Sequence, residues 1–215
     1  MTNLKMHKKI LEAIFLTYEH SKQLFEDAEF LYKHQKPERA YTFYHFSFEE
    51  SGRLFILART LFNYLKGEIP LNKLNIKLLN ENGYRDHIIK LKEASLKLVS
   101  FSYYDSILQN NKENEDNLLN FYDNLKEKIP KLNNNKNKSI YLCFENNNFK
   151  KPSDNITEDD IFYIRAIAEM QLINIEKNLF IFLKKDTNLI EMKNEIKEKK
   201  INKQNLAKLN NNGKN

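Results

Sequence analysis

A histidine lies between two cations in the segment from Tyr84 to Leu91, with Arg85 two residues before His87 and Lys90 three residues after it. Histidine titrates near neutral pH, so it can accept or give up a proton under physiological conditions. The charged side chains of Arg85 and Lys90 can hold an anion such as a phosphate. We therefore interpret His87 as a candidate for acid/base catalysis, with Arg85 and Lys90 as anion-holding neighbours.

A second polar cluster lies inside the long apolar segment 38–65. The aromatic and aliphatic residues of this segment point in every direction around a helical turn, which predicts a central helix without a solvent face. Its middle nevertheless carries His45, Glu49, Glu50 and Arg53. His45, Glu49 and Arg53 follow one another at four-residue spacing and so share one face. Buried charges need partners, so these residues form either a self-satisfied internal cluster or part of a functional cleft.

The elements that position these residues are expected to be long helices, because the 215 residues include only four Gly and four Pro. The periodicity predicts an all-α antiparallel helical bundle. Its expected helices are residues 4–32, 38–65, 84–108 and 118–129, followed by a last helix that begins after a Thr157 cap and buries a stripe from Ile161 to Phe182. Pro130 is expected to end the fourth helix, between polar loops at 110–117 and 131–139.

A small β-hairpin insertion is predicted near residues 139–152, from the strand-forming run 140–144 and a return strand at 149–152. We expect residues 1–184 to form the helical domain. Residues 185–215 are expected to be a polar, basic Lys/Asn-rich C-terminal extension. Of the net charge of +6, most comes from this end, since nine Lys and four acids follow from position 184 onward. Overall basicity is therefore no argument for nucleic-acid binding by the body.

The single cysteine, Cys143, permits no internal disulfide, and no Cys/His cluster has metal-ligand spacing, so we expect no metal and no cofactor. No apolar run approaches the ~18 residues of a membrane span. The first residues lack the apolar stretch of a signal peptide. We expect a cytoplasmic protein that does not interact with a membrane.

Three blocks of the sequence resemble a known family. Ser47 to Arg53 (SFEESGR) is similar to the Glu-Glu-x-Gly-Lys signature of the abortive-infection V (AbiV) group of HEPN-domain phage-defence proteins, with Arg53 where Lys is usual. Tyr84 to Leu91 resembles the aromatic-x-x-His-x-x-Lys-Leu element of that group. The stretch from Ser139 to Phe144, with Pro152 and the helix start after Ile156, resembles its tyrosine-containing strand, proline and next helix.

The resemblance implies a HEPN-like helical bundle, usually a homodimer, with a cleft that in many HEPN proteins cleaves RNA without a metal. Such cleavage uses the 2′-hydroxyl of the RNA as nucleophile and needs proton transfer and cations around the phosphate. His87 is then the acid/base candidate, Arg85, Lys90 and Arg53 hold the phosphate, and Glu49 and Glu50 orient them or act as base. The alternative catalytic pair is Arg39 and His45, which match the Arg-(four to six residues)-His spacing of the wider HEPN nuclease motif but lie early in the chain.

The hypothesis is an antiphage endoribonuclease that cuts cellular RNA, such as tRNA or mRNA, halts translation as a toxin does, and responds to a phage-encoded activator. The alternative is a non-catalytic HEPN module that binds RNA or a phage or host protein and blocks translation. A third interpretation is a HEPN partner that neutralises or tethers a nucleotidyltransferase.

Overall fold

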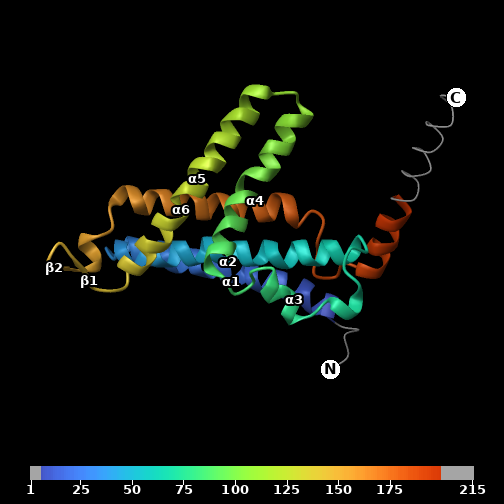
Figure 1. Ribbon diagram of the computed structural model, residues 1–215, viewed down its shortest axis with the longest axis horizontal. Helices are drawn as coiled ribbons and strands as arrows, with labels where there is room; N and C mark the ends of the chain where they lie inside the picture. The colour runs from blue at the N-terminus through green and yellow to red at the C-terminus, as the bar shows by residue number, and fades with distance from the viewer. Residues whose placement is uncertain (1–5, 200–215) are drawn as a thin grey trace.

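Two long antiparallel helices form the centre of the computed structural model, which describes residues 6–199 (Figure 1). α1 spans Met6–Lys33 and α2 spans Pro37–Leu65. Pro37 suits the first turn of α2, where its missing N–H leaves no helical hydrogen bond unmade. Gln35 has a φ of 57° in the connection between the two helices. This short left-handed turn reverses the chain, so that α2 returns along α1.

The remaining helices pack around α2. α6 (Glu158–Asn174) runs along it, while α4 (His87–Leu108) and α5 (Lys112–Lys138) cross it and form a helical hairpin whose tip projects from the bundle (Figure 1). The smaller elements are a 3-10 turn at Leu71–Lys73, α3 at Ile76–Glu81, a 3-10 turn at Pro152–Asp154 and a helix at residues 189–199. The expected all-α bundle is confirmed.

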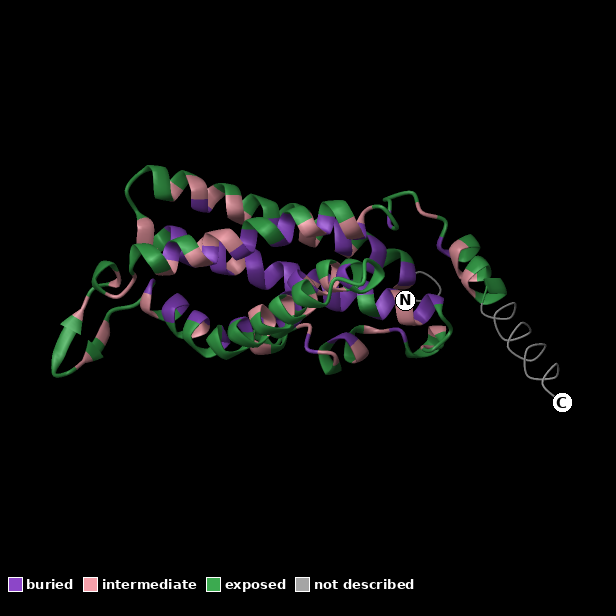
Figure 2. Ribbon diagram, turned by 90° about the horizontal axis from the view of Figure 1, so that it is seen from above, coloured by how far each residue is buried: buried purple, intermediate pink, exposed green. Residues whose placement is uncertain are grey.

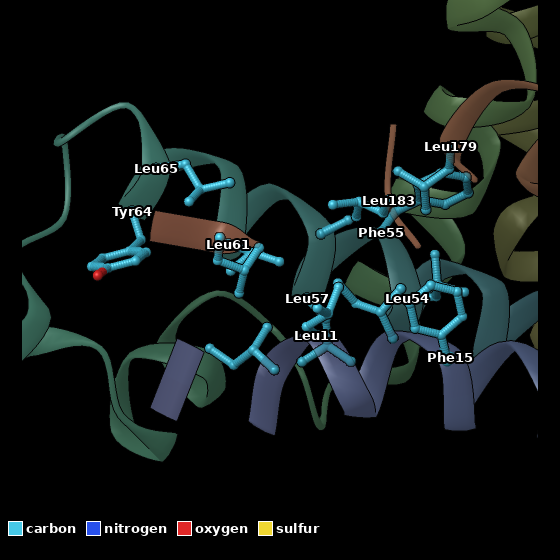
Figure 3. Packing of buried hydrophobic residues seen from close by; sticks show 14 of the residues in the cluster. Leu11, Phe15, Leu54, Phe55, Leu57, Leu61, Tyr64, Leu65, Leu179 and Leu183 are labelled. Carbon is cyan, nitrogen blue, oxygen red and sulfur yellow. The ribbon is translucent and has the colours of Figure 1, made fainter. Parts of the chain in front are cut away.

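Most residues of α2 are buried, as expected of a central helix (Figure 2). Near its C-terminal end, Leu54, Leu57 and Leu61 pack on Leu11 and Phe15 of α1 (Figure 3). Toward its N-terminal end, a second cluster joins it to α4, α5 and α6, centred on three fully buried aromatic residues of α2: Tyr41, Tyr44 and Phe48. Such aromatic side chains bury large apolar areas and fix the positions of the surrounding helices.

The prediction of polar loops at 110–117 and 131–139 is wrong over most of both ranges, because α5 continues from Lys112 to Lys138 with Pro130 inside it. Asn111 caps the helix by accepting the Asn114 N–H at 3.1 Å. Buried residues recur at helical spacing on both sides of the proline: Leu125, Ile129, Leu132, Asn135 and Lys136. This packing offsets the hydrogen bond that proline removes.

The buried stripe predicted for the last helix holds up to Leu179 but not at Phe182, whose side chain is 62% exposed. A π-helical turn at Ile175–Leu179 follows α6, and a wider turn shifts the register of the residues beyond it. Leu183 is buried in the place expected for Phe182. Leu189, at the start of the helix at 189–199, is also buried in this cluster. The expected C-terminal extension continues past residue 199, outside the described residues.

The predicted hairpin is present but shorter and displaced, with β1 at Cys143–Glu145 and β2 at Asn148–Lys150. Asn146 and Asn147 both have positive φ values, of 52° and 61°. A two-residue turn with this backbone closes an antiparallel hairpin tightly, and asparagine tolerates it well. Within residues 6–199 the structure contains no helix that is long and apolar enough to cross a membrane.

Candidate active site

Gly52 brings α2 and α4 into direct backbone contact. A Cβ atom at this position would lie 1.9 Å from the carbonyl oxygen of Lys90 and 2.7 Å from its carbonyl carbon. The two helices can cross this closely only because glycine has no side chain. The crossing places the neighbouring Glu49 and Glu50 beside the first turn of α4, which carries His87 and Lys90.

The carboxylate of Glu49 lies at the centre of the site. Its Oε1 is 2.6 Å from Nδ1 of His87 and 2.5 Å from Nζ of Lys90. The side chains of Glu49 and Lys90 are only 2% and 1% exposed. A buried carboxylate and a buried ammonium group in contact neutralise each other, which makes their burial tolerable. The positive end of the α4 dipole further favours an acid at this position.

The imidazole of His87 is the part of this cluster that reaches solvent, with 59% of the side chain exposed. An ionised carboxylate can only accept a hydrogen bond, so Nδ1 of His87 carries the proton shared with Glu49. Nε2 is then the nitrogen that remains for a ligand. A carboxylate that fixes the tautomer and orientation of a histidine is a common feature of acid/base sites.

The two adjacent glutamates differ in their electrostatic environment. Burial raises the pKa of Glu49, but the hydrogen bonds and charges of Lys90 and His87 outweigh it and leave the pKa below its ordinary value. Burial also raises the pKa of Glu50, and there the charges of Arg53 and Lys90 do not fully compensate, so the pKa stays above its ordinary value. The surroundings therefore favour the ionised form of Glu49, whereas Glu50 is the carboxyl group better suited to exchange a proton.

Arg53 is held on two sides. Its Nη1 lies 2.8 Å from Oε2 of Glu50, and its guanidinium carbon lies 5.2 Å from the centre of the Tyr84 ring. An ion pair and a cation–π contact together restrict the orientation of a long side chain. Since the side chain remains 29% exposed, the guanidinium stays accessible to an anion.

Arg85 is exposed in the turn that precedes α4, two residues before His87. Asp86 caps that helix by accepting the Ile89 N–H at 2.9 Å, which fixes the position of His87 in its first turn. The structure thus brings together five of the six residues named as the first catalytic set: His87, Glu49, Glu50, Arg53 and Lys90. Arg85 is close to His87 in sequence but forms no hydrogen bond or ion pair with these five side chains.

The alternative pair, Arg39 and His45, is not brought together. Arg39 is exposed, whereas the side chain of His45 is 0% exposed. Burial lowers the pKa of His45 to about 3, although the charge of Glu49 opposes that shift. Nδ1 of His45 lies 3.9 Å from Oε2 of Glu49. His45 is therefore a neutral interior residue behind Glu49, and substrate cannot reach it in this conformation.

Two residues of the site, Gly52 and Tyr84, lie within the motifs that resemble the family but were not predicted to be site residues. Gly52 permits the helix crossing, and a glycine inside a strongly apolar helix is a signal of close backbone approach. Tyr84 supports Arg53, and only the tertiary contact between the start of α4 and the middle of α2 reveals this. Among the described residues, no three or more His, Cys, Asp or Glu side chains are grouped so that they could hold a metal ion.

The sequence model of a HEPN protein family, described as AbiV, matches residues 9–172. This range covers α1 through α6 almost completely and includes every residue of the cluster around Glu49. No curated protein and no solved structure matches the chain.

Proposed function

Because the chain belongs to the AbiV family of HEPN proteins, an abortive-infection family, we propose that it is an antiphage effector that cleaves RNA without a metal ion. The observation that carries this proposal is the hydrogen bond between the buried carboxylate of Glu49 and the exposed imidazole of His87. The imidazole is thus held by a carboxylate on one side and open to solvent on the other, with Arg53 linked to the same cluster through Glu50. The side chain of His87 is 59% exposed, so its free nitrogen is accessible to a substrate.

In the proposed reaction, Nε2 of His87 takes the proton from the 2′-hydroxyl of RNA. The resulting oxygen attacks the adjacent phosphorus, and the bond to the 5′ oxygen of the next nucleotide breaks. The product is a 2′,3′-cyclic phosphate and a free 5′-hydroxyl. Glu49 stabilises the imidazolium that forms on His87, because its own charge persists throughout.

The leaving 5′ oxygen needs a proton, and Glu50 is the carboxyl group in the cluster whose pKa is raised. It supplies the proton from its protonated form, in which the ion pair with Arg53 is released and the guanidinium is free to hold the phosphate. Arg53 and Arg85 are the candidates to stabilise the charge that develops on the phosphate. Lys90 is too deeply buried to reach a substrate and instead holds Glu49 in place. In this scheme Lys90 is a positioning residue.

A non-catalytic binding function is the second candidate, and the β-hairpin region favours it. Tyr141, Leu142, Phe144 and Phe149 are each at least 62% exposed there. Large apolar side chains grouped on the surface suit contact with another protein. A second copy of the chain or a phage-encoded activator is the partner proposed for this region, and light scattering with and without the substitution Phe149→Ser tests self-association.

The catalytic proposal is tested by incubating the purified protein with an RNA oligonucleotide and the DNA oligonucleotide of the same sequence in EDTA. The expected result is cleavage of the RNA alone, leaving 2′,3′-cyclic phosphate ends. Cleavage of both strands, or of neither, would contradict a reaction that begins at the 2′-hydroxyl. Intact RNA from a protein that is nevertheless toxic to cells would favour the binding function.

A further inference from the structure

One face of α2 continues from the candidate active site toward the N-terminal end of the helix. Phe46 precedes Glu50 by four residues, Phe43 lies three residues further back, and Arg39 four more. These steps keep all four side chains on one side of an α-helix. Arg39 is exposed, and the two phenylalanines are partly exposed.

A groove opens over this face. It has a volume of about 640 Å³, and Arg39, Phe43 and Phe46 form its α2 side. The opposite side comes from the segment between α5 and α6 and includes Ile140 and Lys151. Along the helix, Arg39 lies roughly 16 Å from Glu50, at 1.5 Å per residue. The groove and Glu50 therefore lie on the same face of α2, although none of the residues that line the groove belongs to the candidate active site.

The charge of the groove favours an anionic ligand. Its lining holds two cations, Arg39 and Lys151, and one acid, Glu38. A second groove of about 540 Å³ between α1 and α6 has the opposite balance, with two lysines against four glutamates: Lys22, Lys33, Glu26, Glu29, Glu169 and Glu176. Both grooves contain two phenylalanines, so the sign of the charge is what distinguishes them.

We propose that the groove along Arg39, Phe43 and Phe46 binds single-stranded nucleic acid next to the cleaved bond. This inference rests on the proposed ribonuclease function and names the surface that holds the rest of the strand. Cations that contact phosphates, combined with aromatic rings on which bases stack, are the general means of binding single strands. Arg39 and Lys151 contact phosphates, and Phe43 and Phe46 stack on bases.

The groove is not expected to distinguish RNA from DNA. Phosphates and base faces occur in both RNA and DNA, so the groove binds either strand with similar affinity. Only the reaction at His87 requires the 2′-hydroxyl. The two properties can therefore be measured separately, with DNA as a bound but uncleaved ligand.

The experiment measures binding of fluorescent single-stranded RNA and DNA to the His87→Ala protein at several salt concentrations. The groove variant adds Arg39→Ala and Lys151→Ala, both at exposed positions. The matched control adds Lys22→Ala and Lys33→Ala instead, which removes the same charge from the acidic groove. Thermal unfolding establishes that all three proteins are folded.

The binding constant falls as salt rises, and the steepness of this fall depends on the number of phosphate contacts. Loss of two contacts in the groove variant is expected to reduce the magnitude of the slope of log binding constant against log salt concentration by about 1.4, with no such change in the control. A separate Phe46→Leu substitution is expected to weaken binding about tenfold at every salt concentration through lost stacking. An unchanged slope in the groove variant, or an equal loss in the control, would overturn the proposal. A change in oligomeric state with unchanged strand binding would instead assign the groove to a second copy.

Cleavage by the unaltered protein separates this inference from the proposed function. Strand binding through the groove without any RNA cleavage would uphold the groove and refute the catalytic proposal. RNA cleavage together with an unchanged salt slope in the groove variant would refute the groove alone. If the His87→Ala protein bound neither strand, the groove proposal would be overturned.

Discussion

Replacing Lys90 with Met removes a buried cation from the carboxylate of Glu49 while nearly preserving the length and apolar surface of the side chain. Both partners are almost completely inaccessible, at 1% and 2% exposure. After the substitution, Glu49 keeps the hydrogen bond to His87, but the ammonium charge that compensated its burial is gone. An unpaired buried carboxylate is therefore the main consequence.

Breaking a buried ion pair from one side typically costs about 3–5 kcal/mol of unfolding free energy. The retained contact with His87 places Lys90→Met near the lower end, at about 3 kcal/mol. Glu49→Gln is expected to cost a similar or smaller amount, because Nζ of Lys90 still has Glu50 at 4.0 Å. The double substitution leaves no uncompensated charge from this pair, so it should cost less than the sum of the two single changes by about 2 kcal/mol.

Urea denaturation of the four proteins measures these free energies, with Lys92→Met as the matched control on the exposed side of α4. The control should stay within about 0.5 kcal/mol of the unaltered protein. Two results would refute the description of Glu49 and Lys90 as a coupled buried pair. One is a loss of unfolding free energy below about 1 kcal/mol in each single variant, and the other is a loss in the double variant that equals the sum of the two single losses.

Three further outcomes follow from the packing. Gly52→Ala should destabilise the protein by about 2 kcal/mol or more in thermal unfolding. The added methyl group clashes with the rigid backbone of Lys90, and the cost of this clash exceeds the ~1 kcal/mol gain in helix propensity. The neighbouring substitution Ser51→Ala should cost under about 1 kcal/mol. The pKa of His45 is lowered on folding from 6.5 to about 3, so the unfolded chain binds more protons between these values. Stability should fall as pH drops below about 6.5, by up to roughly 1.4 kcal/mol per unit from this residue, and His45→Leu should flatten the curve measured by urea titration. Arg165→Ala removes a two-point contact with Glu29, at 2.6 and 3.0 Å, but the partly exposed pair should cost only about 1 kcal/mol; a loss above about 3 kcal/mol would contradict that.

Much of the fold could be predicted because local periodicity and packing agree in the first, second and last helices. α2 begins one residue before the predicted position and ends at Leu65 as predicted. Prediction failed where tertiary contacts override a local signal. Pro130 suggested a helix end, yet the stripe through Leu125 and Leu132 keeps α5 continuous. The π-helical turn after Asn174 likewise changes register without any breaker in the sequence.

The composition of the candidate site could be predicted more readily than its geometry. Spacing on α2 placed Glu49 in line with His45 and Arg53, but the side chain of Arg53 bonds Glu50 instead. The partners of Glu49 come from α4, which lies 38 residues away in sequence at His87. Contacts between helices this far apart depend on the crossing at Gly52, and helical periodicity contains no information about that angle.

The central claim is that His87, oriented by Glu49, performs metal-independent RNA cleavage. Its most direct test compares the unaltered protein with His87→Ala and with His34→Ala on the same RNA in EDTA. His34 is an exposed histidine just after α1, with its ring hydrogen-bonded to the carbonyl oxygen of Phe30. Thermal unfolding establishes that all three proteins are folded at the assay temperature. We expect the unaltered protein and His34→Ala to cleave equally and His87→Ala to be inactive. Full cleavage by His87→Ala would contradict the assignment of catalysis to this site.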